Sequence, residues 1–325
     1  MTSVLQTAAP QFSLADAEAL ARDRFGIDGA ARLLTSERDQ NFYLQTQKGD
    51  EFVLKIANAS ESPQVMAFQN AVMLHLERTN PTLPAPHVVP TRLGELQCVE
   101  RGHIVRTLTW RAGRLMHQVE RTPLLRKSLG ATHALLSKAL ATCAAEAPPS
   151  DLLWDLQRAA QLRPLLEHVP EPDRAALLRS VLNRFEESVL PWLQAAPSQI
   201  IHNDLNPHNV VVDESGRVSG VIDFGDMVRA PLICDVAVAA AYHVRHDEAP
   251  LVDALEYIDA FSAERPLSAE ERALLPDMIA MRLAMTVLIT NWRATLYPEN
   301  KAYILRNEPN AWRGLTAMAQ AELLQ

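Results

Sequence analysis

The chain has 325 residues, 48% of them hydrophobic, with a formal net charge of −8 and a pI of about 5.7. A chain of this length can bury a large core, and its length predicts two domains or lobes. The acidic balance argues against nucleic acid as a partner, because phosphate contacts require an excess of basic side chains.

The cysteines and apolar segments indicate the compartment. Cys98, Cys143 and Cys234 are far apart in the sequence and lack metal-ligand spacing, so we expect free thiols in a reducing environment. The N-terminus has no basic region followed by an apolar run, so no signal peptide is expected. The stretch LAMTVLITNW (283–292) is about half as long as a membrane span requires. We therefore expect a cytoplasmic protein without a membrane segment.

The first 110 residues are predicted to form mostly strands with one inserted helix. In SLADAEALARDRFG (13–26), Ser13 and Asp16 have the spacing of a capping box, and Gly26 is expected to end the helix. A second helix is predicted over SPQVMAFQNAVMLHLERT (62–79), where apolar residues recur at helical spacing. Short β-prone runs separated by polar turns predict strands, the first three as an antiparallel meander: ARLLTS (31–36), NFYLQTQ (41–47), FVLKIAN (52–58), LQCVE (96–100) and HIVRTLTW (103–110).

The remainder is predicted to be mostly helical. One exception is 199–224, where two or three short strands are expected. The candidate helices lie near 121–143, 154–168, 173–195, 230–245, 250–262 and 270–296.

Two polar loops bounded by apolar strands carry the chemistry. IIHNDLNPHNVVVD (200–213) contains Asp204 and Asn209, and VIDFGD (221–226) contains Asp223. The valines after Asn209 and the strand before Asp223 can pair as a hairpin joined by ESGR (214–217). Asn209 then precedes one strand and Asp223 ends the other, so both lie at the open end of this hairpin.

These side chains suit a site for Mg²⁺ and phosphate. Mg²⁺ binds one or two carboxylates and completes its shell with phosphate oxygens and water. A carboxylate that is not a ligand, here Asp204, can accept a proton from an attacking hydroxyl. The pattern H-x-D-x-x-x-x-N followed by D-F-G is typical of protein kinases. The alternative is that Asp204, Asn209 and Asp223 only form turns.

A kinase also needs a lysine for the nucleotide phosphates. FVLKIAN places Lys55 inside an apolar strand, where a charged side chain is costly unless it meets an anion. We expect Lys55 to bind the phosphates. The alternative is a lysine at the edge of the sheet that reaches solvent.

The sequence resembles the aminoglycoside phosphotransferase/choline kinase family of small-molecule kinases, and within it the hydroxylysine kinases. The closer likeness rests on SERDQNFYL (36–44), HNDLNPHN (202–209), VSGVIDFGDM (218–227) and LYPENKAYIL (296–305). The resemblance implies an α+β, protein kinase-like fold of two lobes. Residues 1–108 would form an antiparallel-sheet lobe with one inserted helix that binds nucleotide. Residues 109–325 would form a larger, mostly helical catalytic and substrate-binding lobe.

The resemblance also implies roles for residues of the first lobe. Ser36 and Asn41, in the glycine-free turn SERDQN, would contact the nucleotide phosphates. Thr107 and Leu108, in RTLTW (106–110), would lie at the hinge, where the backbone binds the purine. Relatives pair the strand lysine with a glutamate, whereas this chain has Gln69 at the matching position. Either Gln69 suffices, or Glu61 takes that role.

In the second lobe, His202 and Asp235 are expected to support the catalytic loop without acting in catalysis. The loop after DFGD is short and lacks A-P-E, which favours a small alcohol over a protein as acceptor. Asp226 is expected to face the acceptor. Arg282 and Arg293, on a long apolar helix, are candidates to meet an acceptor carboxylate, although a surface or interhelical ion pair explains either arginine at least as well.

The sequence therefore predicts a kinase that uses Mg²⁺ and either ATP or GTP. Its acceptor would be the hydroxyl of a small amino alcohol or a hydroxy amino acid of the hydroxylysine type. An aminoglycoside, choline/ethanolamine or homoserine kinase is the alternative within the same chemistry. A catalytically inactive nucleotide-binding module is the alternative from another class, and the intact Lys55, Asp204, Asn209 and Asp223 argue against it. The sequence does not indicate an oligomeric state.

Overall fold

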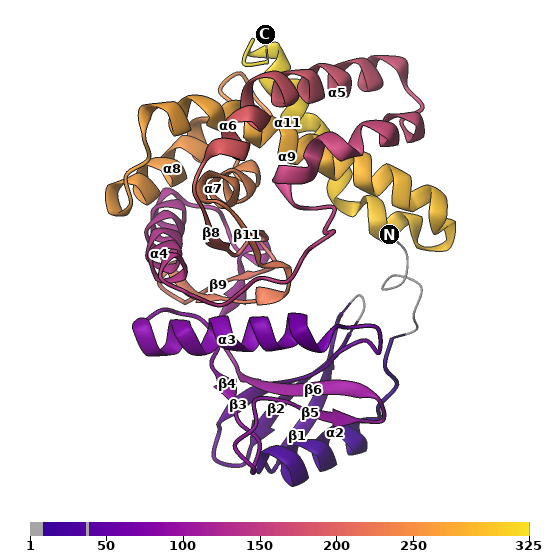
Figure 1. The fold of residues 1–325 in the computed structure, drawn as a ribbon, viewed down its shortest axis with the longest axis vertical. Helices are drawn as coiled ribbons and strands as arrows, with labels where there is room; N and C mark the ends of the chain where they lie inside the picture. Colours follow the sequence, from indigo (N-terminus) through magenta and orange to yellow (C-terminus); the bar gives the residue numbers. More distant parts are fainter. Residues whose placement is uncertain (1–8, 37–38, 325) are drawn as a thin grey trace. The chain divides into compact units, whose positions relative to one another are not determined.

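The computed structural model describes residues 9–36 and 39–324 and divides the chain into two compact units (Figure 1). Unit 1 comprises the described part of residues 1–113, with 143–149 and 219–222. Unit 2 comprises 114–142, 150–218 and the described part of 223–325. The antiparallel sheet of the first unit and the helical character of the second confirm the predicted fold class.

Unit 1 is built on an antiparallel sheet with the strand order β1-β2-β3-β6-β4, in which β5 also pairs with β6. The three predicted meander strands are present, and so are the two that follow them. The sequence analysis did not predict the two-residue β4. The strands are β1 (Gly29–Leu34), β2 (Gln40–Thr46), β3 (Glu51–Ile56), β4 (Val88–Val89), β5 (Cys98–Glu100) and β6 (His103–Thr109).

One face of this sheet carries the core of unit 1. Alternate residues of β2 and β3 are buried, among them Phe42, Leu44, Leu54 and Ile56, as expected for a pleated strand with one apolar face. The helix α2 (Leu14–Leu20) and the π-helical turn η1 (Ala21–Phe25) contribute side chains to the same cluster.

The predicted ends of this first helix are confirmed. Ser13 and Asp16 form a reciprocal capping box. Gly26 ends the helical segment with φ 73°, a left-handed conformation that side chains with a Cβ rarely adopt.

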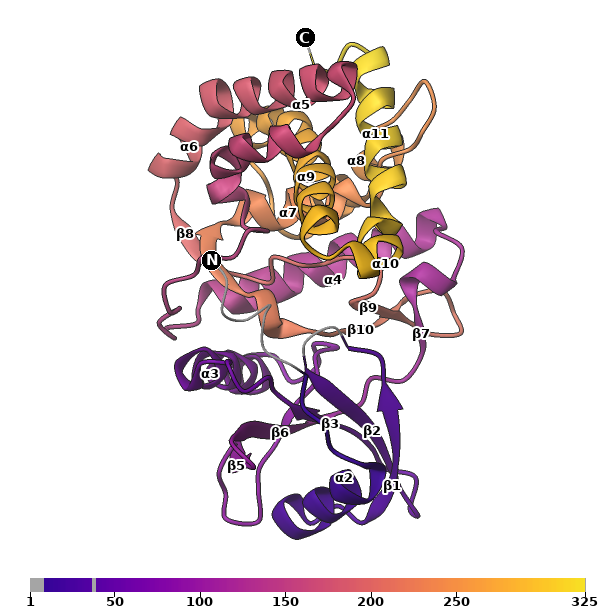
Figure 2. The same ribbon diagram turned by 90° about the vertical axis from the view of Figure 1, so that its right-hand side faces the viewer.

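The inserted helix α3 (Pro63–Thr79) lies on the side of the sheet opposite to α2 (Figures 1 and 2). Arg106 of β6 is buried and donates hydrogen bonds to Gln69 at 2.6 Å and to Asn70 at 3.1 Å, both on α3. These bonds fix the helix against the sheet face that does not carry the apolar core.

Unit 2 is mostly helical. Its α-helices are α4 (Pro123–Ala141), α5 (Pro172–Arg184), α6 (Leu190–Ala195), α7 (Leu232–Ala241), α8 (Val252–Glu264), α9 (Ala269–Leu296), α10 (Lys301–Ile304) and α11 (Glu308–Gln320). Its 3₁₀ and π segments are η2 (Met116–Gln118), η3 (Leu156–His168), η4 (Phe185–Val189), η5 (Phe224–Asp226), η6 (Pro298–Asn300) and η7 (Leu305–Asn307). The sequence did not predict α11.

The centre of unit 2 is formed by α7 and α9. Figure 2 shows α9 between α5, α7 and α11, and it contacts all three helices. At 28 residues, α9 is long and apolar enough to cross a membrane, but 78% of its most apolar window is buried inside the protein. Its composition is therefore that of a core helix.

Helices α4 and α8 approach each other closely at Gly130. A Cβ at this position would lie 2.5 Å from the carbonyl oxygen of Tyr257 and 2.8 Å from the Cβ of Ala260. Real Cβ atoms do not come so near backbone atoms, so glycine is required for this helix pair.

Short strands position the two polar loops. A three-stranded sheet has the order β10-β9-β7, and a separate antiparallel pair joins β8 with β11. The predicted hairpin of the valine run with the next strand is present as β9 and β10. The strands are β7 (Arg114–Leu115), β8 (Ser198–Ile201), β9 (Val210–Val212), β10 (Val218–Val221) and β11 (Val228–Pro231).

Candidate active site

The first polar loop, residues 202–209, runs from the end of β8 to the start of β9. Asp235, on the first turns of α7, holds its beginning. The completely buried Asp235 carboxylate accepts backbone N–H bonds from His202 at 3.0 Å and from Asn203 at 2.7 Å. It also lies 3.0 Å from Nε2 of the buried His133. Although Asp235 is buried, these partners keep its pKa below the ordinary carboxyl value.

Two further contacts join this loop to the second loop, residues 222–227. The ring of His202 packs edge-on against Phe224, with centroids 4.9 Å apart. The side chain of Asn203 donates a hydrogen bond to the backbone carbonyl of Asp226 at 3.2 Å. Asn203 has φ 65°, in the left-handed region, which asparagine adopts more readily than most other non-glycine residues.

The carboxylate of Asp204 is held at the centre of the first loop. Its Oδ2 accepts hydrogen bonds from the side-chain amides of Asn206 at 2.9 Å and Asn209 at 2.8 Å. The side chain is 24% exposed, and its Oδ1 lies 3.7 Å from Nη2 of Arg282. The carboxylate is therefore fixed in place and is still accessible.

The pKa of Asp204 is raised to about 7. Burial is the largest cause, and repulsion by the Asp226 carboxylate is the next; Asp223 adds a smaller repulsion. Arg282 acts in the opposite direction and favours the charged form. The carboxylates of Asp204, Asp223 and Asp226 and the guanidinium of Arg282 therefore interact electrostatically. A pKa near neutral pH suits a general base.

The second loop places Asp223 directly after β10. Asp223 has φ 63° and ψ 74°, which is again the left-handed region. A Cβ at the neighbouring Gly225 would lie 3.2 Å from Oδ1 of Asp223. The absence of a side chain at Gly225 leaves space beside this exposed carboxylate.

Asn209 and Asp223 have the chemistry of a magnesium site. Asn209 uses its amide nitrogen for both of its hydrogen bonds, to the backbone and the side chain of Asp204, so its amide oxygen is available as a ligand. No group of three or more His, Cys, Asp or Glu side chains within 9–36 and 39–324 could hold a metal. A small set of oxygen ligands completed by phosphates fits Mg²⁺, which binds few protein groups in nucleotide sites.

Arg282 lies in the middle of α9 and is 3% exposed. Its guanidinium lies over the ring of Trp154, 4.7 Å from the centroid, and donates to the hydroxyl of Tyr242 at 3.3 Å. Its Nε and Nη1 atoms are buried and have no hydrogen-bond partner in the described part of the chain. Arg293 lies three turns further along the same helix and is half-buried.

The residues assigned to the nucleotide lie in unit 1. Lys55 is half-buried on β3, with Asn41 of β2 and Arg106 of β6 as its cross-strand neighbours. Its side chain points to the face opposite to Leu54 and Ile56, because neighbouring residues of a strand alternate. This is the sheet face on which Arg106 bonds to Gln69, so the Gln69 oxygen is already engaged by a guanidinium.

Thr107 and Leu108 lie inside β6. Both pair with β3 on one side and with β4 on the other. Pairing on two edges uses the backbone groups of a strand, which argues against the expected binding of a purine by this backbone. Ser36 is exposed, and part of its turn, residues 37–38, lies outside the described residues.

The sequence analysis did not assign a role to several residues of the candidate site. Asn203 and Asn206 were within the quoted motif but had no assigned role, although asparagines beside a catalytic carboxylate are a signal for hydrogen bonding. His133, Trp154 and Tyr242 come from distant segments, and their sequence context carries no signal.

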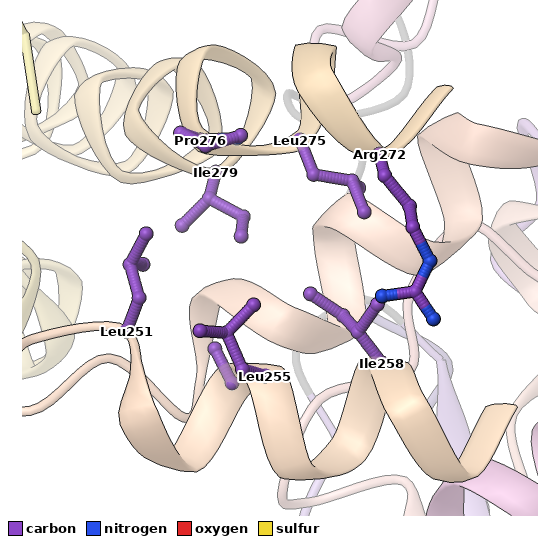
Figure 3. A pocket seen from close by; sticks show the side chains of 8 residues that line it. Leu251, Leu255, Ile258, Arg272, Leu275, Pro276 and Ile279 are labelled. Carbon is purple, nitrogen blue, oxygen red and sulfur yellow. The ribbon is translucent and has the colours of Figure 1, made fainter. Parts of the chain in front are cut away.

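Another pocket lies away from these loops, between α8 and α9 (Figure 3). Its lining is apolar except for Arg272, and it contains neither a carboxylate nor a histidine. It therefore lacks the groups that phosphoryl transfer requires.

Unit 2 contains the H-x-D-x-x-x-x-N and D-F-G loops, and unit 1 contains an antiparallel sheet that carries Lys55. These features are typical of kinases. An amicoumacin kinase solved with AMP-PNP and Ca²⁺ has a similar structure, with a TM-score of 0.62 and 14% identity over 86% of this chain and 88% of that one. A microcompartment-associated aminopropanol kinase superimposes with a TM-score of 0.63 and 18% identity, over 93% of this chain and 99% of that one.

Residues 30–272 match the phosphotransferase enzyme family, and the chain belongs to this family. It is similar to the hydroxylysine kinase of Mus musculus, with 28% identity over 95% of this chain and 90% of the relative. It is also similar to the homoserine kinase of Neisseria meningitidis, with 34% identity over 50% of this chain and 51% of the relative. The protein is thus a small-molecule kinase that phosphorylates a hydroxyl group.

Proposed function

We propose that the protein transfers the γ-phosphoryl group of ATP or GTP to the hydroxyl of a small hydroxy amino acid, of the hydroxylysine type. The observation that carries this proposal is the carboxylate of Asp204, fixed by two asparagine amides and with a pKa near neutrality. Similarity to hydroxylysine kinase over nearly the whole chain supports this class of acceptor.

The proposed roles follow the geometry of the two loops. Asp204 accepts the proton of the attacking hydroxyl, because its carboxylate is accessible and has a pKa close to neutral pH. Asn209 and Asp223 would hold Mg²⁺, which neutralises charge on the nucleotide phosphates when bound. His202 and Asp235 keep the loop in this conformation.

In unit 1, Lys55 would bind the α- and β-phosphates, with Asn41 and Ser36 assigned to the phosphates as well. Gln69 is assigned an indirect role. Its amide oxygen accepts a hydrogen bond from Arg106, which is the cross-strand neighbour of Lys55. Thr107 and Leu108 support the sheet beside Lys55, and their backbone is not assigned to the purine.

The acceptor side of the site is assigned to Asp226 and Arg282. Asp226 acts on Asp204 electrostatically, so an ammonium group between these two carboxylates would relieve their repulsion. Arg282 borders the position of the reacting hydroxyl through its contact with Asp204. Arg293 has less support, since its position three turns further along α9 is the only observation for it.

A panel of acceptors tests the proposal. Turnover would be measured with 5-hydroxylysine, homoserine, ethanolamine, choline and kanamycin, each with ATP and with GTP. We expect the highest kcat/KM with 5-hydroxylysine, and a phosphate on its hydroxyl oxygen by ³¹P NMR. Preference for kanamycin or choline would overturn the proposed acceptor class.

Homoserine is the second candidate acceptor. The identity to homoserine kinase is higher than that to hydroxylysine kinase but covers only half of the chain. The two acceptors share an α-amino acid group and differ in the length of the chain that carries the hydroxyl. The same panel separates them by the ratio of their kcat/KM values.

The inactive alternative and the compartment also have direct tests. A nucleotide-binding module without activity would give a nucleotide-dependent thermal shift but no product with any acceptor.

Cys98, Cys143 and Cys234 are free thiols, which supports a location in the reducing cytoplasm. Cell fractionation would check this location.

A further inference from the structure

Two basic residues, Lys55 and Arg106, are neighbours on one face of the sheet of unit 1. They occupy the adjacent strands β3 and β6 and pair directly with each other in the antiparallel ladder. Residues that pair in this way project to the same face, with their Cβ atoms about 5 Å apart. Lys55 is half-buried, whereas Arg106 is 3% exposed. One cation is thus accessible, and a second cation is enclosed beside it.

The hydrogen bonds from Arg106 to α3 satisfy its donors without cancelling its charge. Its Nη2 donates to the side-chain oxygen of Gln69 at 2.6 Å, and its Nη1 donates to that of Asn70 at 3.1 Å. The amide nitrogen of Asn70 donates to Gln97 at 2.9 Å, so the oxygen of Asn70 is directed at Arg106. Gln69 and Asn70 are both buried and both neutral. Neither bond brings the negative charge that a carboxylate would supply.

The enclosed guanidinium acts on its surroundings at a distance. A buried charge is screened less than one in water, because the effective dielectric constant is lower and counterions are excluded. The field of Arg106 therefore adds to that of Lys55 on the same face of the sheet. Like charges directly opposite each other lower the stability of a sheet, and an anion bound beside Lys55 relieves this repulsion. The arrangement suits a polyanion such as the phosphate chain of a nucleotide.

We propose that Arg106 is a positioning residue that strengthens the binding of the nucleotide phosphates by Lys55, and that Gln69 must be neutral for this effect. The inference rests on the proposed function, which assigns the phosphates to Lys55. Arg106 is too deeply buried to contact the phosphates itself. Its charge adds to the attraction at Lys55, and its bonds to α3 keep the guanidinium in place. A carboxylate at position 69 would pair with Arg106 and cancel this charge.

A different role for residue 69 predicts the opposite effect. If residue 69 served chiefly to orient the ammonium group of Lys55, a glutamate there would form a stronger, charge-assisted bond and improve nucleotide binding. On the present proposal the same glutamate weakens nucleotide binding, because it neutralises Arg106 and repels the phosphates. Gln69→Glu changes the charge with almost no change in size, so the sign of its effect separates the two roles.

Nucleotide affinity and turnover in matched variants test the proposal. The Kd for ATP and for GTP would be measured by calorimetry with Mg²⁺, and kcat with 5-hydroxylysine as the acceptor. We expect Gln69→Glu and Arg106→Gln each to raise the Kd about tenfold, with kcat within about twofold of the wild type. Arg106→Lys keeps the charge and should retain most of the affinity. Gln64→Glu makes the same charge change at an exposed position of α3 and should keep the wild-type Kd.

Thermal unfolding separates this effect from a loss of structure. In Gln69→Glu, the charge-assisted bond to Arg106 should keep the Tm at or above the wild-type value. A raised Kd in this variant then reports the nucleotide site and not a less stable fold. Arg106→Gln removes two buried hydrogen bonds and should lower the Tm. If it fails to fold, Gln69→Glu still decides the question.

Lys55→Gln distinguishes failure of this inference from failure of the proposed function. A wild-type Kd in Lys55→Gln would mean that the nucleotide binds elsewhere, which overturns both. If Lys55→Gln weakens binding but Gln69→Glu binds nucleotide as tightly as the wild type, or more tightly, only the role of Arg106 is overturned. Equal losses of affinity in Arg106→Lys and Arg106→Gln would also overturn it, because the hydrogen bonds of Arg106, and not its charge, would then support the site.

Discussion

The guanidinium of Arg282 lies 3.7 Å from the carboxylate of Asp204. Arg282 is packed against Trp154 and Tyr242, so it cannot move away from this contact without losing both. Its charge opposes the effects of burial and of Asp226, which raise the pKa of Asp204 to about 7. Arg282 therefore favours the ionised form of Asp204, which is the form that the proposed general base requires.

Replacing Arg282 should shift the activity to higher pH. Removing a nearby cation raises the pKa of a carboxyl group, and Asp204 must be ionised to accept a proton. We expect the acidic limb of the kcat/KM profile, near pH 7 in the wild type, to move up by about one pH unit in Arg282→Met. Arg282→Lys should show a smaller shift. Superimposable pH profiles would contradict this role for Arg282.

Asp204→Asn should separate catalysis from nucleotide binding. Asparagine has nearly the same size but cannot take the proton of the hydroxyl. General-base assistance typically contributes about 10²–10⁴ in rate, so kcat should fall by roughly this factor. Nucleotide affinity, measured by calorimetry on the same variant, should change little. A large loss of affinity with kcat retained would mean that Asp204 is a metal or phosphate ligand.

Asn209 and Asp223 should determine the requirement for magnesium. Asn209→Ala removes one ligand, so half-maximal activity should need a higher Mg²⁺ concentration, and Asp223→Ala should lose turnover at any Mg²⁺ concentration. Asn206→Ala is the matched control, because Asn206 also bonds to Asp204 but has no assigned ligand role. Equal Mg²⁺ requirements in Asn209→Ala and Asn206→Ala would argue against the metal site.

The elements predicted correctly from the sequence are those with a local signal. Alternating burial of Phe42 and Leu44 is visible as alternating hydrophobicity, and the capping box of Ser13 and Asp16 lies within four residues. The strands β4, β7 and β11 were not predicted, because none of these short segments shows a hydrophobic period. They form because neighbouring strands provide partners, and this is tertiary information.

In the candidate site, too, residues with a local sequence signal were predicted, whereas contacts between distant segments were not. Asp204, Asn209 and Asp223 could be assigned to the candidate site because two short motifs contain them. Arg282 and Arg293 were indistinguishable in the sequence, since eleven residues make about three helical turns and place both on the same side of α9. Contacts with Asp204, Trp154 and Tyr242 distinguish Arg282 in the structure. Similarly, the bond from Arg106 to Gln69 joins residues 37 positions apart, and no local pattern predicts it.

Asp235→Asn should destabilise the protein. The buried carboxylate accepts backbone N–H bonds on both oxygens, whereas asparagine would present one N–H₂ group to a donor. We expect a loss of about 2–4 kcal/mol in the free energy of unfolding, measured with urea. The pKa of Asp235 is lower in the folded state than its ordinary value of 3.8. Its contribution to the free energy of unfolding is therefore present above pH 3.8, and it is lost as the pH falls through the pKa of the folded state.

The exposed Asp213 is the matched control for this change. It accepts hydrogen bonds only within its own turn, so Asp213→Asn should cost much less. Equal losses in the two variants would show that the bonds of Asp235 to the loop do not contribute to stability.

His243 should make the protein sensitive to acid. The residue is 4% exposed, stacks on Tyr257 at 5.5 Å, and neither ring nitrogen has a hydrogen-bond partner among the described residues. Burial, and then the charges of Arg121 and Arg126, lower its pKa from 6.5 to about 3. Between these values the unfolded chain binds a proton that the folded chain does not. The contribution of His243 to stability is therefore complete above pH 6.5 and decreases as the pH falls below it.

At pH 5 this difference corresponds to a loss of about 2 kcal/mol relative to neutral pH, at 1.36 kcal/mol for each pH unit below 6.5. His243→Phe keeps an aromatic ring beside Tyr257 and removes the titrating group. We expect urea unfolding to show a smaller decrease in stability between pH 7 and pH 5 for this variant than for the wild type, by about this amount. At pH 7 the variant should be as stable as the wild type, or more stable, because two unsatisfied ring nitrogens are removed. Equal decreases in both proteins would mean that His243 is protonated in the folded state, and its burial without partners would then need another explanation.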